Sequence, residues 1–170
     1  MVTTKTDVLI VGAGPTGLAL ACQLMRHGVD FVIVDKNETT TAHSKAIGVQ
    51  ARTLEIYEQM GLAGGLIAQG ALAEKARLVV GGEVRGEIEF ADIGRGLSPY
   101  PFVLIVEQGR HEKLLHDFIR AGGREVRWRT WLEEFTQDGR GVTARIADGG
   151  GAVETVEARF LVGCDGARSP

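Results

Sequence analysis

The chain has 170 residues and an ordinary globular composition, with 44% hydrophobic and 24% charged residues. Its formal net charge is −3, so nothing indicates a nucleic-acid partner, which would favour a basic face. It contains neither a run of about 18 apolar residues nor a signal peptide. Its two cysteines lie far apart without a CxxC pattern, which favours unpaired thiols in a reducing compartment. We therefore expect no membrane span and a cytoplasmic location.

The beginning of the chain predicts a strand, a glycine turn, a helix and a second strand. Asp7–Val11 is a short apolar run that leads into Gly12-x-Gly14-x-x-Gly17. An amphipathic helix then ends at Gly28, and Phe31–Asp35 forms the second strand. Both strands are continuously apolar, which is typical of a parallel sheet covered on both faces.

The rest of the chain alternates helical and extended patterns. The strand at the end leads into an Asp-Gly turn, after which the sequence stops, so we expect a fragment of a longer protein. Mixed strands and helices of these lengths predict an α/β fold, with a parallel sheet carrying helices on both faces and a three-stranded antiparallel meander. The expected elements are a helix over 50–60, a hairpin of 77–80 and 83–90 around Gly81-Gly82, a strand over 102–106, a helix over 110–121, meander strands over 125–135, 142–147 and 152–158, and a final strand over 160–166.

The glycine turn is the arrangement that holds a dinucleotide pyrophosphate. Gly12 permits the tight turn, Gly14 lets the phosphates approach the backbone, and Gly17 lets the helix pack closely. Pro15 suits the first helical position, and the amides that follow, beginning with Thr16, face the phosphates at the positive end of the helix dipole. The pattern alone is weak evidence, but here it follows a strand and opens a helix. It predicts a nucleotide cofactor, with FAD as the first hypothesis.

An acid ends the second strand, about where the motif requires one. Asp35 would accept a hydrogen bond from an adenosine ribose hydroxyl, with Lys36 beside it in the cofactor site. A carboxylate there disfavours a 2′-phosphate and therefore NADP in this first fold. The alternative for Asp35 is a solvated acid at a strand end.

Four segments together resemble class A flavoprotein monooxygenases, the aromatic hydroxylases of the phenol and para-hydroxybenzoate hydroxylase type. The resemblance covers nearly the whole chain in the expected order and implies a Rossmann-like FAD-binding fold. The last three segments are more specific than the first. The segments are the glycine fingerprint 12–17, the helix 46–57 followed by Gly61-Leu62, the Gln-Gly-Arg-His-Glu segment 108–115, and the Asp-Gly segment 162–169.

The resemblance assigns roles to two polar side chains in the middle of the chain. Arg52 matches the family arginine near the FAD pyrophosphate and ribityl region, and a guanidinium suits a diphosphate through bidentate hydrogen bonds. Its alternative is a surface arginine paired with Glu55. Gln108 matches the family glutamine at the ribityl side, and without the family it reads as a polar residue at a helix N-terminus.

Three further positions follow from the same resemblance. Asp165 and Arg168 match the Asp-Gly motif linked to FAD and NAD(P)H, with a plain turn as the alternative. Lys45 stands where the family commonly has arginine, which keeps the charge but loses the planar fork. We expect no metal site, since the spacing of His111 and His116 does not suit a metal pair. We expect Trp128 and Trp131 to be packing residues, with a stacking platform as the alternative.

The resemblance implies the FAD-binding part of a monooxygenase that uses NAD(P)H and O2 to hydroxylate a small aromatic substrate. No side chain here needs to be an acid or base, because the flavin carries the chemistry. We expect 1–170 to be an incomplete FAD-binding domain, inactive alone, with 77–101 beginning a substrate-region β insertion. The alternatives are a stand-alone FAD-binding module or a related epoxidase, halogenase or reductase. The substrate, the choice of NADH or NADPH and the oligomeric state stay open.

Overall fold

The computed structural model describes residues 2–41, 46–90 and 94–166, which gather into two compact units. Unit 1 contains residues 1–42 and 115–170, and unit 2 contains residues 43–114. Within the described ranges, no helix has both the length and the apolar character that crossing a bilayer requires.

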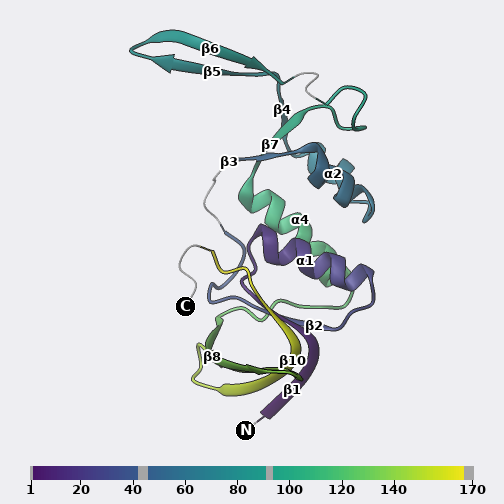
Figure 1. Cartoon of the computed structure of the whole chain (residues 1–170), viewed down its shortest axis with the longest axis vertical. Helices are drawn as coiled ribbons and strands as arrows, with labels where there is room; N and C mark the ends of the chain where they lie inside the picture. Colours follow the sequence, from purple (N-terminus) through teal and green to yellow (C-terminus); the bar gives the residue numbers. More distant parts are fainter. Residues whose placement is uncertain (1, 42–45, 91–93, 167–170) are drawn as a thin grey trace. The chain divides into compact units, whose positions relative to one another are not determined.

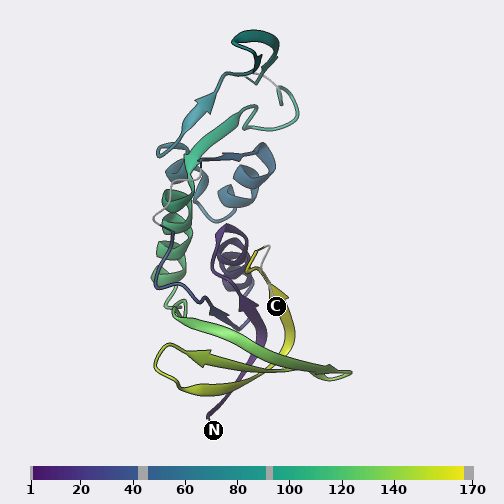
Figure 2. The same cartoon turned by 90° about the vertical axis from the view of Figure 1, so that its left-hand side faces the viewer.

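Unit 1 is built on one five-stranded sheet with the strand order β2-β1-β10-β9-β8. β1 pairs in parallel with both β2 and β10, and Figure 2 shows β1 and β10 running side by side. β10, β9 and β8 form the expected antiparallel meander. The strands are β1 (Val2–Val11), β2 (Phe31–Val34), β8 (Thr130–Asp138), β9 (Gly141–Asp148) and β10 (Val153–Gly163).

Helix α1 (Pro15–Arg26) follows the glycine turn, as the apolar period predicts. Leu18, Ala21 and Cys22 are fully buried on its inner face. The Cys22 thiol donates a 3.6 Å hydrogen bond to the carbonyl of Leu115 in α4 (Gln108–Ala121), which holds that half of α4 beside α1. The α/β class and the parallel strands expected from the sequence are therefore confirmed.

The parallel strands and the meander share one buried cluster. It joins side chains of β1 and β2 to side chains of β9 and β10. The buried cluster consists of Leu9, Val11, Val32, Val34, Val142, Ala144, Ile146, Val156 and Ala158.

β10 corrects an expectation, because the sequence reads as two strands over 152–158 and 160–166 and the structure has one. The single strand pairs with β1 along Val2–Val11 and with β9 along Val142–Ala147. Between the two expected strands lies Arg159, which has no turn-forming tendency of its own and carries its guanidinium to the carboxylate of Asp7 at 3.6 Å. Continuous pairing with β1 therefore keeps the chain extended.

Unit 2 contains a three-stranded antiparallel sheet with the order β3-β7-β4 and two helices. α2 forms where expected and buries Leu54 and Tyr57. The short elements β3, α3 and β4 are not foreseen by the sequence analysis. The bounds are β3 (Ala46–Val49), α2 (Ala51–Glu58), α3 (Ala63–Ile67), β4 (Ala71–Ala73) and β7 (Val103–Glu107).

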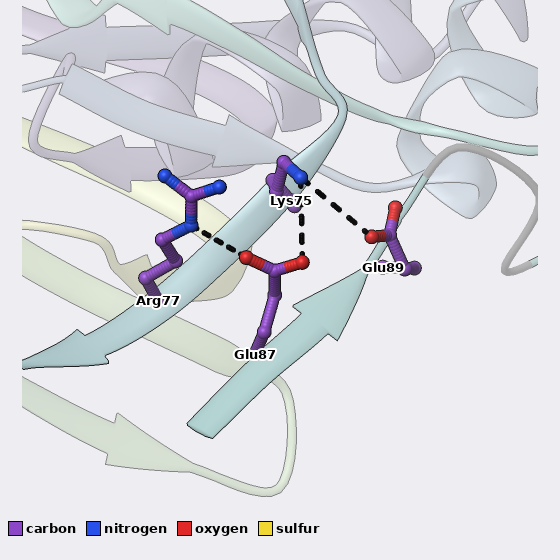
Figure 3. A network of polar contacts seen from close by, with 4 residues as sticks. All are labelled: Lys75, Arg77, Glu87 and Glu89. Carbon is purple, nitrogen blue, oxygen red and sulfur yellow. Dashed lines mark hydrogen bonds and ion pairs between the residues drawn. The ribbon is translucent and has the colours of Figure 1, made fainter. Parts of the chain in front are cut away.

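The expected hairpin is present as β5 (Lys75–Val80) and β6 (Glu83–Glu89), which form a two-stranded sheet of their own in Figure 1. Every residue of both strands is exposed. One face carries an ion-pair network, in which Lys75 lies 3.3 Å from Glu87 and 3.9 Å from Glu89 (Figure 3). Since side chains alternate along a strand, the opposite face is apolar. It presents the exposed side chains of Leu78 and Ile88.

Candidate functional site

The glycine turn between β1 and α1 depends on close backbone approach at two of its three glycines. Gly12 has φ +106°, and a Cβ there would lie 2.4 Å from the carbonyl carbon of Cys164. A Cβ on Gly17 would lie 1.9 Å from the carbonyl oxygen of Gly12. A Cβ on Gly14 would meet nothing within 4 Å. Gly12 and Gly17 therefore close the turn, whereas the space beside Gly14 is open to a ligand.

The start of α1 is arranged to receive an anion. Gly14 is the N-cap residue, and Pro15 follows as the first helical residue. Among the described residues, no side chain caps this end of the helix. Thr16 is exposed, and the first-turn amides of Thr16 and Gly17 have no acceptor within the helix. Together with the helix dipole, these amides suit the oxygens of an anionic ligand.

Asp35, directly after β2, is tied to the glycine turn by its side chain. Its Oδ2 accepts a 2.6 Å hydrogen bond from the amide of Ala13, and its Oδ1 accepts a 2.8 Å hydrogen bond from the amide of Asn37. A carboxylate has about four acceptor positions, so two remain for further donors. Asp35 therefore supports the turn and keeps capacity for a ribose hydroxyl.

A cavity of about 290 Å³ adjoins this corner of unit 1. It brings together four predicted site residues, Gly12, Asp35, Lys36 and Asp165, at the carboxyl ends of parallel strands, where ligands bind in open α/β sheets. The other lining residues are Val11, Val34, Asn37, Thr130, Trp131 and Leu132. Trp131 is 39% exposed, so the expectation that it is a packing residue does not describe it.

Arg52 and Gln108 both belong to unit 2. Arg52 pairs with Glu55 at 3.0 Å, the alternative that its spacing suggested, and its side chain is 77% exposed. Glu55 also accepts a 2.7 Å hydrogen bond from the hydroxyl of Ser98. This hydrogen bond is the main cause that lowers the pKa of the Glu55 carboxyl, and the pair with Arg52 is the second. The Gln108 amide donates to Glu112 at 2.8 Å. The exposed Arg52 guanidinium stays accessible to an anionic ligand.

A buried polar pair joins α2 to the first turns of α4. The hydroxyl of Tyr57 and Nε2 of His111 lie 2.7 Å apart, and both side chains are buried. Nδ1 of His111 is buried without a hydrogen-bond partner among the described residues. Burial lowers the pKa of the His111 imidazole, so the neutral form is favoured. The sequence gives no signal for this pair, because its members are 54 positions apart.

Two predicted site residues, Lys45 and Arg168, lie outside the described residues. Their assigned roles remain those implied by the resemblance. The described candidates fall into two sets, with the glycine turn, Asp35, Lys36 and Asp165 in unit 1 and Arg52 and Gln108 in unit 2.

The parallel strands, the open helix start and the acid after β2 define a dinucleotide-binding fold. Residues 5–170 match the family described as FAD binding domain, and the chain belongs to that family.

Comparison with known proteins agrees with the resemblance drawn from the four motifs, which is confirmed. The chain is 35% identical over 169 residues to a flavin-dependent monooxygenase of Mycobacteroides abscessus, covering 95% of this chain and 35% of that protein. It is similar to the flavin-dependent monooxygenase PieE, solved with FAD and substrate, at 29% identity and a TM-score of 0.85, covering 97% of this chain and 31% of PieE. It is also similar to the p-nitrophenol 4-monooxygenase PnpA of Pseudomonas putida DLL-E4, at 25% identity and a TM-score of 0.87, covering 99% of this chain and 42% of PnpA. The chain thus spans about a third of the curated relative's length.

Proposed function

We propose that this chain is the FAD-binding part of a monooxygenase that hydroxylates a small aromatic substrate with O2 and NAD(P)H. The observation that carries the proposal is the open space at Gly14, beside a helix start that no described side chain caps. A monooxygenase that acts on p-nitrophenol and one solved with FAD and substrate share this fold.

The residues of unit 1 support FAD as the ligand of the glycine turn. The amides of Thr16 and Gly17 would receive the diphosphate at the open face of Gly14. The acceptor positions left on the Asp35 carboxylate would receive the ribose, beside the 290 Å³ cavity. Lys36 lines the same cavity and contributes a positive charge near the anion. Asp165 lines it from the end of β10.

The resemblance assigns the remaining candidates to the same cofactor. Arg52 would exchange its exposed pair with Glu55 for a bidentate contact to phosphate, since exposed pairs are worth about 0–1 kcal/mol. Gln108 would contact the ribityl side, and Lys45 and Arg168 would add positive charge. When bound, FAD supplies the redox chemistry. The side chains of this chain would bind and orient it, and none of them needs to be an acid or base.

The exposed hairpin suits a role outside the FAD site. An isolated two-stranded hairpin is marginal in water, and exposed apolar faces usually mark contact surfaces. The apolar face of Leu78 and Ile88 therefore favours the assignment of 77–101 as the beginning of a substrate region. We also propose a reducing, cytoplasmic location for the protein, since the thiols of Cys22 and Cys164 are free.

The test uses the full-length protein that carries this chain. The protein should copurify with FAD or bind it on titration, and NADH or NADPH oxidation should rise when a panel of phenols is added in the presence of O2. Oxygen from 18O2 should appear in a hydroxylated product. Tight FAD binding without any substrate-stimulated oxidation would instead favour the stand-alone binding module, and absence of FAD binding would contradict the proposal altogether.

A further inference from the structure

The start of β8 lines the unit 1 cavity with Thr130, Trp131 and Leu132. This segment is fixed to the end of β2 by main-chain hydrogen bonds. The amide of Asp35 donates to the carbonyl of Arg127 at 3.0 Å, and the amide of Thr130 donates to the carbonyl of Asp35 at 2.9 Å. Trp131 follows Thr130 directly, so the indole belongs to the residue next to the one that is hydrogen-bonded to the backbone of Asp35.

The backbone beside Trp131 is held in an uncommon conformation. Arg129 has φ +52°, the one positive φ of a non-glycine residue within the described ranges. Such conformations persist where the surroundings enforce them and are enriched at functional sites. Here the surroundings are visible, because the amide of Arg129 donates to the carbonyl of Asn37 at 2.8 Å and the amide of Gly149 donates to the carbonyl of Arg129 at 2.9 Å.

The indole itself is available to a ligand. Trp131 is 39% exposed and lines the cavity together with Asp35 and Lys36. The other tryptophan, Trp128, is engaged with the ring of His116 at a centroid distance of 5.6 Å. A large exposed aromatic surface beside a nucleotide phosphate site has an evident partner, because purine bases stack on aromatic side chains.

We infer that Trp131 is the stacking platform for the adenine base of the dinucleotide. The inference rests on the proposed FAD site and adds a residue that selects FAD over a flavin lacking adenosine. The diphosphate lies at α1, the ribose at Asp35 and the base against the indole. In this arrangement Trp131 contributes to cofactor selection and takes no part in redox chemistry.

The experiment compares FAD with FMN, which carries the flavin and one phosphate but no adenosine. The full-length apoprotein is titrated with each ligand by calorimetry, for the wild type and for Trp131→Ala, Trp131→Phe and Trp131→Leu. Stacking on an aromatic side chain corresponds to about 5- to 150-fold in affinity on alanine substitution. The preference for FAD over FMN should fall by that factor in Trp131→Ala, should stay near the wild-type value in Trp131→Phe, and should fall in Trp131→Leu.

The outcomes separate this inference from the function on which it rests. Unchanged FAD preference in Trp131→Ala and Trp131→Leu, with tight FAD binding throughout, overturns the stacking role and leaves the proposed function intact. Equal losses for FAD and FMN overturn it too, since the loss is then not specific to adenosine. If Trp131→Ala fails to fold, the difference between Phe and Leu at this position carries the test. Failure of the wild type to bind FAD refutes the proposed function itself.

Discussion

The carboxylate of Asp35 accepts a 2.6 Å hydrogen bond from the amide of Ala13, inside the glycine turn. The end of the second strand therefore holds the turn that the first strand enters. Because the Ala13 amide is satisfied in this way, the amides left for a diphosphate are those at the start of α1. The acid that the motif places for a ribose also shapes the phosphate site.

Replacing Asp35 should affect both stability and FAD binding. Asp35→Ala removes the acceptors of two backbone amides, Ala13 and Asn37, and should lower the free energy of unfolding by about 1.5–3 kcal/mol, the range for hydrogen bonds to a charged group. Asp35→Asn keeps one acceptor oxygen and should lose less. Urea unfolding at pH 7 and FAD titration check both values. Equal stability of Asp35→Ala and the wild type would contradict the structural role.

Two glycines of the same turn should respond oppositely to an added methyl group. Gly17→Ala places a Cβ 1.9 Å from the Gly12 carbonyl oxygen, so it should destabilise the fold by about 1–3 kcal/mol or more. Gly14→Ala meets nothing within 4 Å and should cost about 1 kcal/mol or less, yet it occupies the proposed diphosphate face and should weaken FAD binding about tenfold or more. Thermal unfolding and FAD titration separate the two effects. Full FAD affinity in Gly14→Ala would argue against this phosphate site.

Arg52 should matter to FAD affinity and little to stability. Its pair with Glu55 is exposed, so Arg52→Ala should change the free energy of unfolding by less than about 1 kcal/mol. Loss of a charge-assisted phosphate contact should weaken FAD binding by about tenfold, with Arg52→Lys in between. Arg140→Ala is the matched control, because Arg140 also forms an exposed pair, with Asp138 at 3.1 Å. Similar FAD affinities for the Arg52→Ala and Arg140→Ala variants would remove Arg52 from the site.

His111 predicts a pH dependence of stability. Burial lowers the pKa of its imidazole below the ordinary 6.5, so the unfolded chain binds the proton more readily. The stability that neutral, buried His111 contributes is therefore complete above pH 6.5. The free energy of unfolding decreases as the pH falls below 6.5, by at most about 1.4 kcal/mol per pH unit. Chemical unfolding at pH 7.5 and 5.5 should show a smaller decline for His111→Gln than for the wild type.

The control for this pH dependence is His27→Gln, since His27 is exposed at the end of α1. It should keep the wild-type decline between the two pH values. If His111→Gln and His27→Gln decline alike, the buried pair with Tyr57 is not the origin of the effect.

The turn around Gly12 and Gly17 could be predicted from the sequence because its requirements are local. The helix start at Pro15 and the hairpin turn at Gly81 follow from residues within a few positions. The short strand β3 and the unbroken β10 could not be predicted, since pairing with β7 and with β1 decides them.

The same limit applies to the candidate site. The spacing of Asp35 from the glycines indicates a ribose ligand, but its bond to Ala13 arises only when β1 and β2 pair. The position of Trp131 arises only when β2 and the start of β8 meet. Sequence patterns indicate which residue types belong to a nucleotide site. Contacts between distant segments decide which further side chains, such as Trp131, line the cavity.

Crystals of the full-length protein grown with FAD test the central claim most directly. The account predicts the diphosphate at the open face of Gly14, with oxygens about 3 Å from the amides of Thr16 and Gly17. A diphosphate bound elsewhere, or a protein side chain covering that face of Gly14, would contradict it.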